Sequence, residues 1–130
     1  MCRGKVVIII GHPLIPFKPL YKVTKVEDIK KTKPNCTILI DFSNKKLLQY
    51  SITQGISLAL HVKSLKDACL ANALGAKFIL IDDSLSKKVQ NIATEYLFDT
   101  KVLIQIEDEN GIEKAAQDLI DGVIFKRGVV

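Results

Sequence analysis

The stretch ISLALHVKSLKDACLANALGAKFILID at residues 56–82 decides the fold, because it predicts one complete strand–helix–strand unit. Ile56–Val62 and Phe78–Ile81 are short apolar runs, which are typical of parallel strands buried on both faces. The segment between them begins with Ser64, three residues before an aspartate, and this pair indicates the start of a helix. Gly75 suits the left-handed residue that often follows a helix. The chain is therefore expected to be an α/β protein.

Similar units continue on both sides of this stretch. Apolar runs predict six strands, and most are followed by a segment in which apolar residues recur with helical spacing. These elements predict a parallel sheet of five or six strands with flanking helices, arranged either as three layers or as a half-barrel. The predicted strands are Lys5–Ile10, Cys36–Phe42, Ile56–Val62, Phe78–Ile81, Lys101–Ile106 and Gly122–Phe125.

Length and composition indicate a single domain over residues 1–130. Apolar residues make up 48% of the chain, which is enough for a hydrophobic core. The positive charge is concentrated in a basic, proline-containing segment at residues 1–35, whereas residues 36–126 hold the regular βα repeats. Nearly all basic residues are lysines, and arginines interleaved with aromatic side chains are missing, so we do not expect binding to nucleic acid.

Targeting and redox features predict a cytoplasmic protein without a membrane partner. The apolar runs are far too short to span a bilayer, and the first residues lack the pattern of a cleavable signal peptide. Cys2, Cys36 and Cys69 form no CxxC pair and are odd in number, which favours reduced thiols. Cys69 is expected to be a small buried side chain on the inner face of its helix.

Pro13, Pro16 and Pro19 recur at every third position of the segment HPLIPFKPLY. This spacing favours extended backbone and excludes a helix or a central strand. The segment is therefore expected to run over the surface, where its apolar side chains either pack across one end of the sheet or contact another subunit. Because a half-barrel also leaves strand edges uncovered, we expect a homo-oligomer, with a dimer as its simplest form.

Two phrases resemble a pattern found at the strand entries of phosphate-handling (β/α)8 barrels. They are ALGAKFILID at residues 73–82 and AQDLIDGVIF at residues 116–125, where a helix ends just before a buried strand. Over residues 56–126 the chain is similar to repeats of thiamine-phosphate synthase and of the barrel domain of quinolinate phosphoribosyltransferase. The resemblance implies barrel-like βα repeats that handle a phosphorylated compound. Because six strands fall short of the eight in a full barrel, a half-barrel or an open sheet is expected.

Residues 36–126 also resemble the receiver domains of response regulators. Asp41 lies at the end of the first strand of this region, Asp82 and Asp83 at the end of the third and Lys126 at the end of the fifth. In that family the acidic cluster holds Mg²⁺, the third-strand aspartate accepts the phosphoryl group and the lysine contacts it. The chain departs from the family by having one first-strand acid instead of a pair, and acidic residues in place of the hydroxyl residue after the fourth strand. The resemblance implies a degenerate, receiver-like domain.

The candidate site residues follow the predicted strands, since ligands of open α/β sheets bind beyond the carboxyl ends of the strands. Imidazole and carboxylate groups can together hold a divalent ion, so Asp41, His61 and Asp82 are candidate metal ligands. The alternative interpretation is that these polar residues cap helices and solvate the sheet edge. The candidates for ligand binding are His12, Asp41, His61, Asp82, Asp83, Glu107, Lys126 and Arg127.

Common catalytic and nucleotide-binding motifs are absent from the sequence. It contains no Walker A or GxGxxG pattern and no recognisable Ser/His/Asp or Cys/His arrangement, so we assign no catalytic residue and no cofactor. The first hypothesis is a non-enzymatic module that binds a small ligand, such as an anionic metabolite, or assembles with itself. The alternatives are a small enzyme acting on a phosphorylated or carboxylated metabolite and a degenerate receiver-like regulatory domain.

Overall fold

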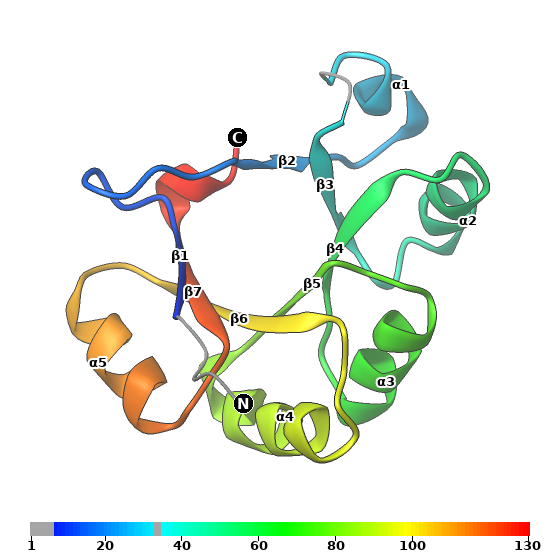
Figure 1. Ribbon diagram of the computed structural model, residues 1–130. Coiled ribbons are helices and arrows are strands. Elements are labelled where there is room, and N and C mark those ends of the chain that lie inside the picture. The colour runs from blue at the N-terminus through cyan, green and yellow to red at the C-terminus, as the bar shows by residue number, and fades with distance from the viewer. Residues whose placement is uncertain (1–6, 33–34) are drawn as a thin grey trace, which may run out of the picture.

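A parallel sheet that curls into a ring forms the centre of the molecule (Figure 1). The computed structural model describes residues 7–32 and 35–130, so the predicted strand residues Lys5 and Val6 lie outside the described residues. The strands in the described ranges are β1 (Ile8–Ile10), β2 (Leu20–Lys22), β3 (Thr37–Asp41), β4 (Ser57–His61), β5 (Phe78–Ile81), β6 (Lys101–Ile106) and β7 (Gly122–Phe125). They form one sheet in the order β1-β7-β6-β5-β4-β3-β2, and every neighbouring pair is parallel. The predicted α/β class with a parallel, half-barrel sheet is confirmed.

The helices lie on the outside of this ring (Figure 1). They are α1 (Val26–Ile29), α2 (Lys45–Thr53), α3 (Leu65–Ala73), α4 (Asp83–Glu95) and α5 (Asn110–Gln117), and a short 3-10 helix, η1 (Lys126–Gly128), follows β7. Because helices cover one face of the sheet, the half-barrel describes the fold and three layers do not. The strands from β2 to β7 follow one another in sequence, which differs from the 2-1-3-4-5 order of doubly wound sheets. Within the described residues, no helix has the length and apolar character needed to cross a membrane.

The prediction of five or six strands was wrong, because the described part of the sheet has seven. The additional strand is β2, which begins at Leu20, directly after the last proline of HPLIPFKPLY. Proline excludes a central strand, but β2 starts beyond Pro19 and lies at an edge of the sheet, where it pairs with β3 and has an isolated bridge from Leu20 to Val129. Phe17 packs against the buried residues inside the ring, whereas Leu14 is 85% exposed. The proline segment therefore packs partly across one end of the sheet.

The last residues of the chain join the two edges of the sheet. The backbone of Val130 accepts a hydrogen bond from Lys22 and donates one to Leu20, both with N···O distances of 2.9 Å. On the other side, a Cβ added to Gly128 would lie 2.8 Å from the side chain of Ile10 in β1. Figure 1 shows this C-terminal segment between β1 and β2. The curled sheet is thus closed on this side by residues that the sequence did not suggest as part of it.

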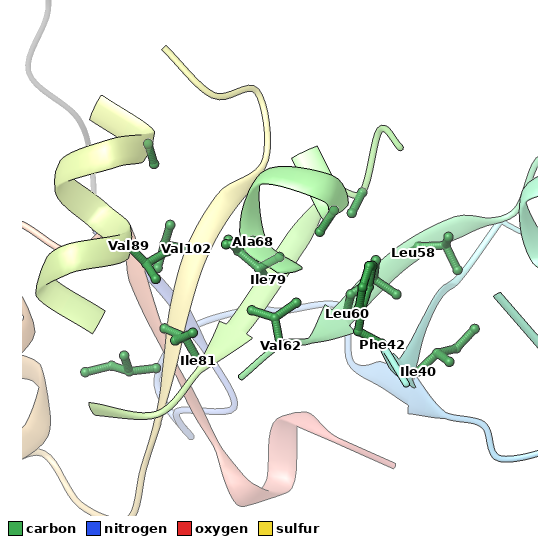
Figure 2. Close-up of a cluster of buried hydrophobic side chains, with 14 of the residues drawn as sticks. Ile40, Phe42, Leu58, Leu60, Val62, Ala68, Ile79, Ile81, Val89 and Val102 are labelled. Atoms are coloured by element: carbon green, nitrogen blue, oxygen red, sulfur yellow. The ribbon is translucent and has the colours of Figure 1, made fainter. Parts of the chain in front are cut away.

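Both faces of the sheet are buried, which explains the continuous apolar strand sequences. Alternate residues point outward and pack against the helices, as Figure 2 shows for Ile79 and Val102 of the sheet with Ala68 of α3 and Val89 of α4. The residues between them point inward, and each strand contributes one to a separate buried cluster. This inner cluster consists of Ile10, Leu20, Leu39, Ala59, Leu80, Leu103 and Ile124.

Helix α3 confirms its predicted start but turns a different face to the sheet. The Ser64 hydroxyl accepts a hydrogen bond from the backbone N–H of Asp67, with an N···O distance of 3.1 Å. Ala68 and Ala71 are the buried residues of this helix, whereas Cys69 is exposed. The prediction of a buried Cys69 was therefore wrong, because the stripe that faces the sheet is centred on the two alanines. Cys2 lies outside the described residues.

Left-handed residues end the four longer helices, but only two of these residues are glycines. Gly55 follows α2 and Gly75 follows α3 with φ angles of 68° and 83°, as expected for glycine after a helix. Leu97 and Leu119 take the equivalent positions after α4 and α5 with φ angles of 52° and 58°. Both side chains are largely exposed, at 85% and 75%, so little packing compensates for their backbone strain.

We expect the substitution Leu97→Gly to stabilise the protein by roughly 0.5–1 kcal/mol, because relief of left-handed strain exceeds the added entropy of the unfolded chain. Urea denaturation measures this change in the free energy of unfolding. The reciprocal variant Gly75→Ala should destabilise the protein by about 1 kcal/mol for the same reason. A loss of stability in Leu97→Gly would show that this side chain makes a stabilising contact that its exposure conceals.

Candidate functional site

A pocket of about 480 Å³ opens at the carboxyl ends of the strands, inside the mouth of the ring. This is the end of a parallel sheet at which α/β proteins bind their ligands. Its volume lies in the range of sites for small molecules. The residues that line it are Lys22, Val23, Thr24, Leu39, Asp41, Asn44, His61, Leu80, Gln105, Lys126 and Val129.

Strand alternation places polar side chains around this mouth. A residue that follows an inward-pointing core residue by two positions points to the same face of the sheet. Leu39 and Leu80 of the inner cluster form an apolar floor in this way, and the next inward positions along the strands are polar. Seven polar residues follow inner-cluster residues by two positions, and those that line the pocket are Lys22, Asp41, His61, Gln105 and Lys126, whereas His12 and Asp82 do not line it.

Asp41 is ionised and anchored at one side of the pocket. The Ser43 hydroxyl donates to Asp41 Oδ1 at 2.7 Å, and the Ser43 backbone N–H donates to the same oxygen at 2.9 Å. These two hydrogen bonds, with smaller contributions from the charges of Lys63 and His61, hold the pKa of Asp41 below its ordinary value of 3.8. The carboxylate charge is therefore present at neutral pH, and its contribution to stability is lost only as the pH falls through this lowered pKa.

Asn44 holds together two of the loops that form the wall of the pocket. Its Nδ2 donates to the backbone carbonyl of Thr24 at 3.1 Å, and its Oδ1 accepts from the N–H of Leu47 at 3.4 Å. Asn44 is thus the N-cap residue of α2. Thr24 is itself fixed by Asp28, whose Oδ2 accepts from the Thr24 N–H and hydroxyl. The segment after β2 is therefore tied to the loop after β3.

The structure brings Asp41, His61 and Lys126 together in the pocket and places the other predicted site residues elsewhere. His12 Nε2 lies 2.8 Å from Glu109 Oε2, and its ring meets that of Phe125 edge-on with centroids 5.6 Å apart. Asp83 accepts a hydrogen bond from Lys114 at the start of α4. The residues of the predicted set that do not line this pocket are His12, Asp82, Asp83, Glu107 and Arg127.

The predicted metal ligands do not form a binding group. Asp41 and His61 are paired across β3 and β4, but Asp82 is the N-cap residue of α4 and is not part of the pocket lining. In residues 7–32 and 35–130, no group of three or more His, Cys, Asp or Glu side chains is arranged to hold a metal ion.

Sequence reasoning missed four polar residues of the pocket. Lys22 and Thr24 were missed because the sequence did not suggest β2, and Asn44 was missed because it caps a helix rather than ending a strand. Gln105 interrupts the apolar run of β6 just as His61 ends that of β4, so a polar residue at an inward position of a buried strand was the usable signal.

Comparison of the sequence with protein-family models finds no match, and a search of curated proteins finds none either.

Proposed function

We propose that this chain is a small ligand-binding α/β module whose mouth pocket takes a small anion bearing a phosphate or carboxylate group. The observation that carries this proposal is that Lys22 and Lys126, which come from opposite ends of the chain, line the same pocket. Asp41 is the only acidic residue among the lining residues, and Ser43 already binds one of its oxygens. The pocket therefore has an excess of positive charge directed at one small volume.

The remaining lining residues suit recognition of a small polar metabolite. Asn44 and Gln105 offer amide groups for hydrogen bonds, His61 offers an imidazole, and Leu39 and Leu80 provide an apolar floor. The resemblance of residues 56–126 to phosphate-handling barrels favours a phosphorylated compound over a simple carboxylate. It adds to the argument from the pocket, and the two lysines are the residues that would contact the anion.

We expect the double substitution Lys22→Ala/Lys126→Ala to abolish binding of a small anion or to weaken it by about tenfold or more, since hydrogen bonds to charged groups are the strong ones. Isothermal titration calorimetry with inorganic phosphate, glucose 6-phosphate and malate measures the affinity of each. The matched control is Lys87→Ala/Lys88→Ala, which removes the same charge from exposed positions of α4. Equal weakening in both variants would show a general charge effect, and no binding of any anion to the native chain would contradict the proposal.

An enzyme acting on the same class of metabolite is the second candidate, and His61 is the observation that favours it. Imidazole is the most common general acid or base, and His61 shares the pocket with Lys126 and Asp41. Loss of turnover in His61→Gln with anion affinity retained would support this alternative.

A receiver-like mechanism would need Asp82 beside Lys126, and Asp82 does not line the pocket. Self-assembly into a homodimer and a cytoplasmic location stay separate predictions.

A further inference from the structure

A second pocket, of about 520 Å³, lies at the opposite end of the ring. It includes Cys36 and Thr37 at the start of β3 and Lys77 and Phe78 at the start of β5, whereas the mouth pocket uses the carboxyl ends of the strands. The two pockets share no lining residue. A ligand in this pocket would therefore contact different residues from the anion proposed for the mouth.

The wall of this second pocket is largely apolar and reaches the interior of the ring. Ile10 and Leu20 belong to the buried inner cluster, and Ile8, Phe17 and Phe78 pack against that cluster. The pocket lies where β1 and β2, the two edges of the sheet, are not paired with each other. The proline segment supplies Pro16 through Tyr21 along one side.

The charged residues at this pocket are all of one sign. Lys18 and Lys77 are exposed, and no acidic side chain is among the described residues that line the pocket. The Lys77 ammonium lies 5.6 Å from the centroid of the Phe78 ring, so a cation stands directly beside the apolar wall. A ligand that fits must combine an apolar body with a negative end near the two lysines.

We propose that this pocket binds a single-chain aliphatic carboxylate, with the hydrocarbon against Ile8, Phe17 and Phe78 and the carboxylate near Lys18 and Lys77. The apolar side chains of the wall accept a hydrocarbon chain, and the two exposed lysines favour an anion over a neutral head group. Each methylene that becomes buried tightens binding by about fourfold. This site extends beyond the proposed function of the mouth.

Titration of the ¹⁵N-labelled chain with octanoate, followed by amide NMR shifts, locates the site and measures its affinity. We expect saturable shifts in the amides of the lining residues of β1, the proline segment and the start of β5, and tighter binding of octanoate than of hexanoate. Those that carry an N–H group are Ile8, Ile9, Ile10, Phe17, Lys18, Leu20, Tyr21, Lys77 and Phe78. The variant Lys18→Glu/Lys77→Glu should lose more than about tenfold in affinity, because both rim charges are reversed. The matched control, Lys87→Glu/Lys88→Glu on α4, should bind octanoate as the native chain does.

Neutral 1-octanol has a hydrocarbon chain of the same length as octanoate but carries no charge, so it measures the contribution of the chain without that of the carboxylate. We expect it to bind several times more weakly than octanoate. Equal affinities of octanol and octanoate would overturn the assignment of a carboxylate. Shifts that do not saturate, or that appear at His61 and Gln105 of the mouth instead, would overturn the site itself. Equal losses of octanoate affinity in Lys18→Glu/Lys77→Glu and in the α4 control would also overturn the site. The NMR spectrum of each variant shows whether it remains folded.

Discussion

The substitution Gly122→Ala is expected to destabilise the protein by roughly 3 kcal/mol, at the upper end of the cost of overpacking a core. Gly122 begins β7, faces Ile8 across the β1–β7 pair and is buried. An added Cβ would lie 2.5 Å from both the Cβ and the carbonyl oxygen of Ile8, and 2.9 Å from a methyl group of Leu103. Because the carbonyl belongs to the backbone, the clash is relieved only by moving β1 away from β7.

Thermal and urea denaturation of Gly122→Ala measure this loss, with Gly55→Ala as the matched control. Gly55 has a φ angle of 68° and no heavy atom within 4 Å of an added Cβ, so this variant carries backbone strain without a clash. It should cost about 1 kcal/mol. If both variants lose the same free energy of unfolding, the close approach of β1 to β7 is not what requires glycine at position 122.

The second large effect is expected for Asp121→Ala, which should destabilise the protein by about 3 kcal/mol. Asp121 Oδ2 accepts a hydrogen bond from the backbone N–H of Val102 in β6 at 2.9 Å. Val102 is fully buried, so removal of the carboxylate leaves this N–H group without its acceptor in an apolar environment. The backbone N–H of Asp121 also donates to Gln90 Oε1 of α4 at 2.8 Å, and alanine keeps that bond.

Asp121→Asn is the control that removes the negative charge of the side chain but keeps an oxygen that can accept the hydrogen bond from Val102. Its amide oxygen can still accept from Val102, so we expect this variant to lose only about 1 kcal/mol in the free energy of unfolding. Hydrogen exchange of the Val102 amide gives a local measure, and it should be faster in the alanine variant than in the asparagine variant. Equal losses of stability in the two variants would show that the hydrogen bond to Val102 is not the main contribution of Asp121.

The regular part of the fold could be predicted because its causes are local. Six of the observed strands coincide with apolar runs, and Ser64 caps its helix as its spacing from Asp67 predicted. β2 is different, because three residues after a proline segment form a strand only when β3 and Val130 are present to pair with them. Which side chains of α3 are buried also depends on how the helix packs against the sheet, so helical spacing alone did not predict that Cys69 is exposed.

The candidate site could be predicted only in part, for a similar reason. Asp41, His61 and Lys126 were found because each follows a recognisable buried strand. Lys22 was missed with its strand, and Gln105 because it lies within an apolar run rather than after it. Asp82 and Asp83 were grouped with the site because they also follow a strand, but Asp82 is the N-cap residue of α4, Asp83 is its first residue, and neither lines the pocket.

The order of strands in the ring also determines when each strand can find its neighbour as the protein is made. Each of the pairs from β3 to β7 joins strands about twenty residues apart, so these strands can associate soon after both have left the ribosome. β1 is the exception, because residue 8 pairs with residue 122 and with no earlier strand. The three consecutive isoleucines of β1 therefore stay without these partners until residues 122–124 have been made, and the apolar segment needs protection from aggregation during that time.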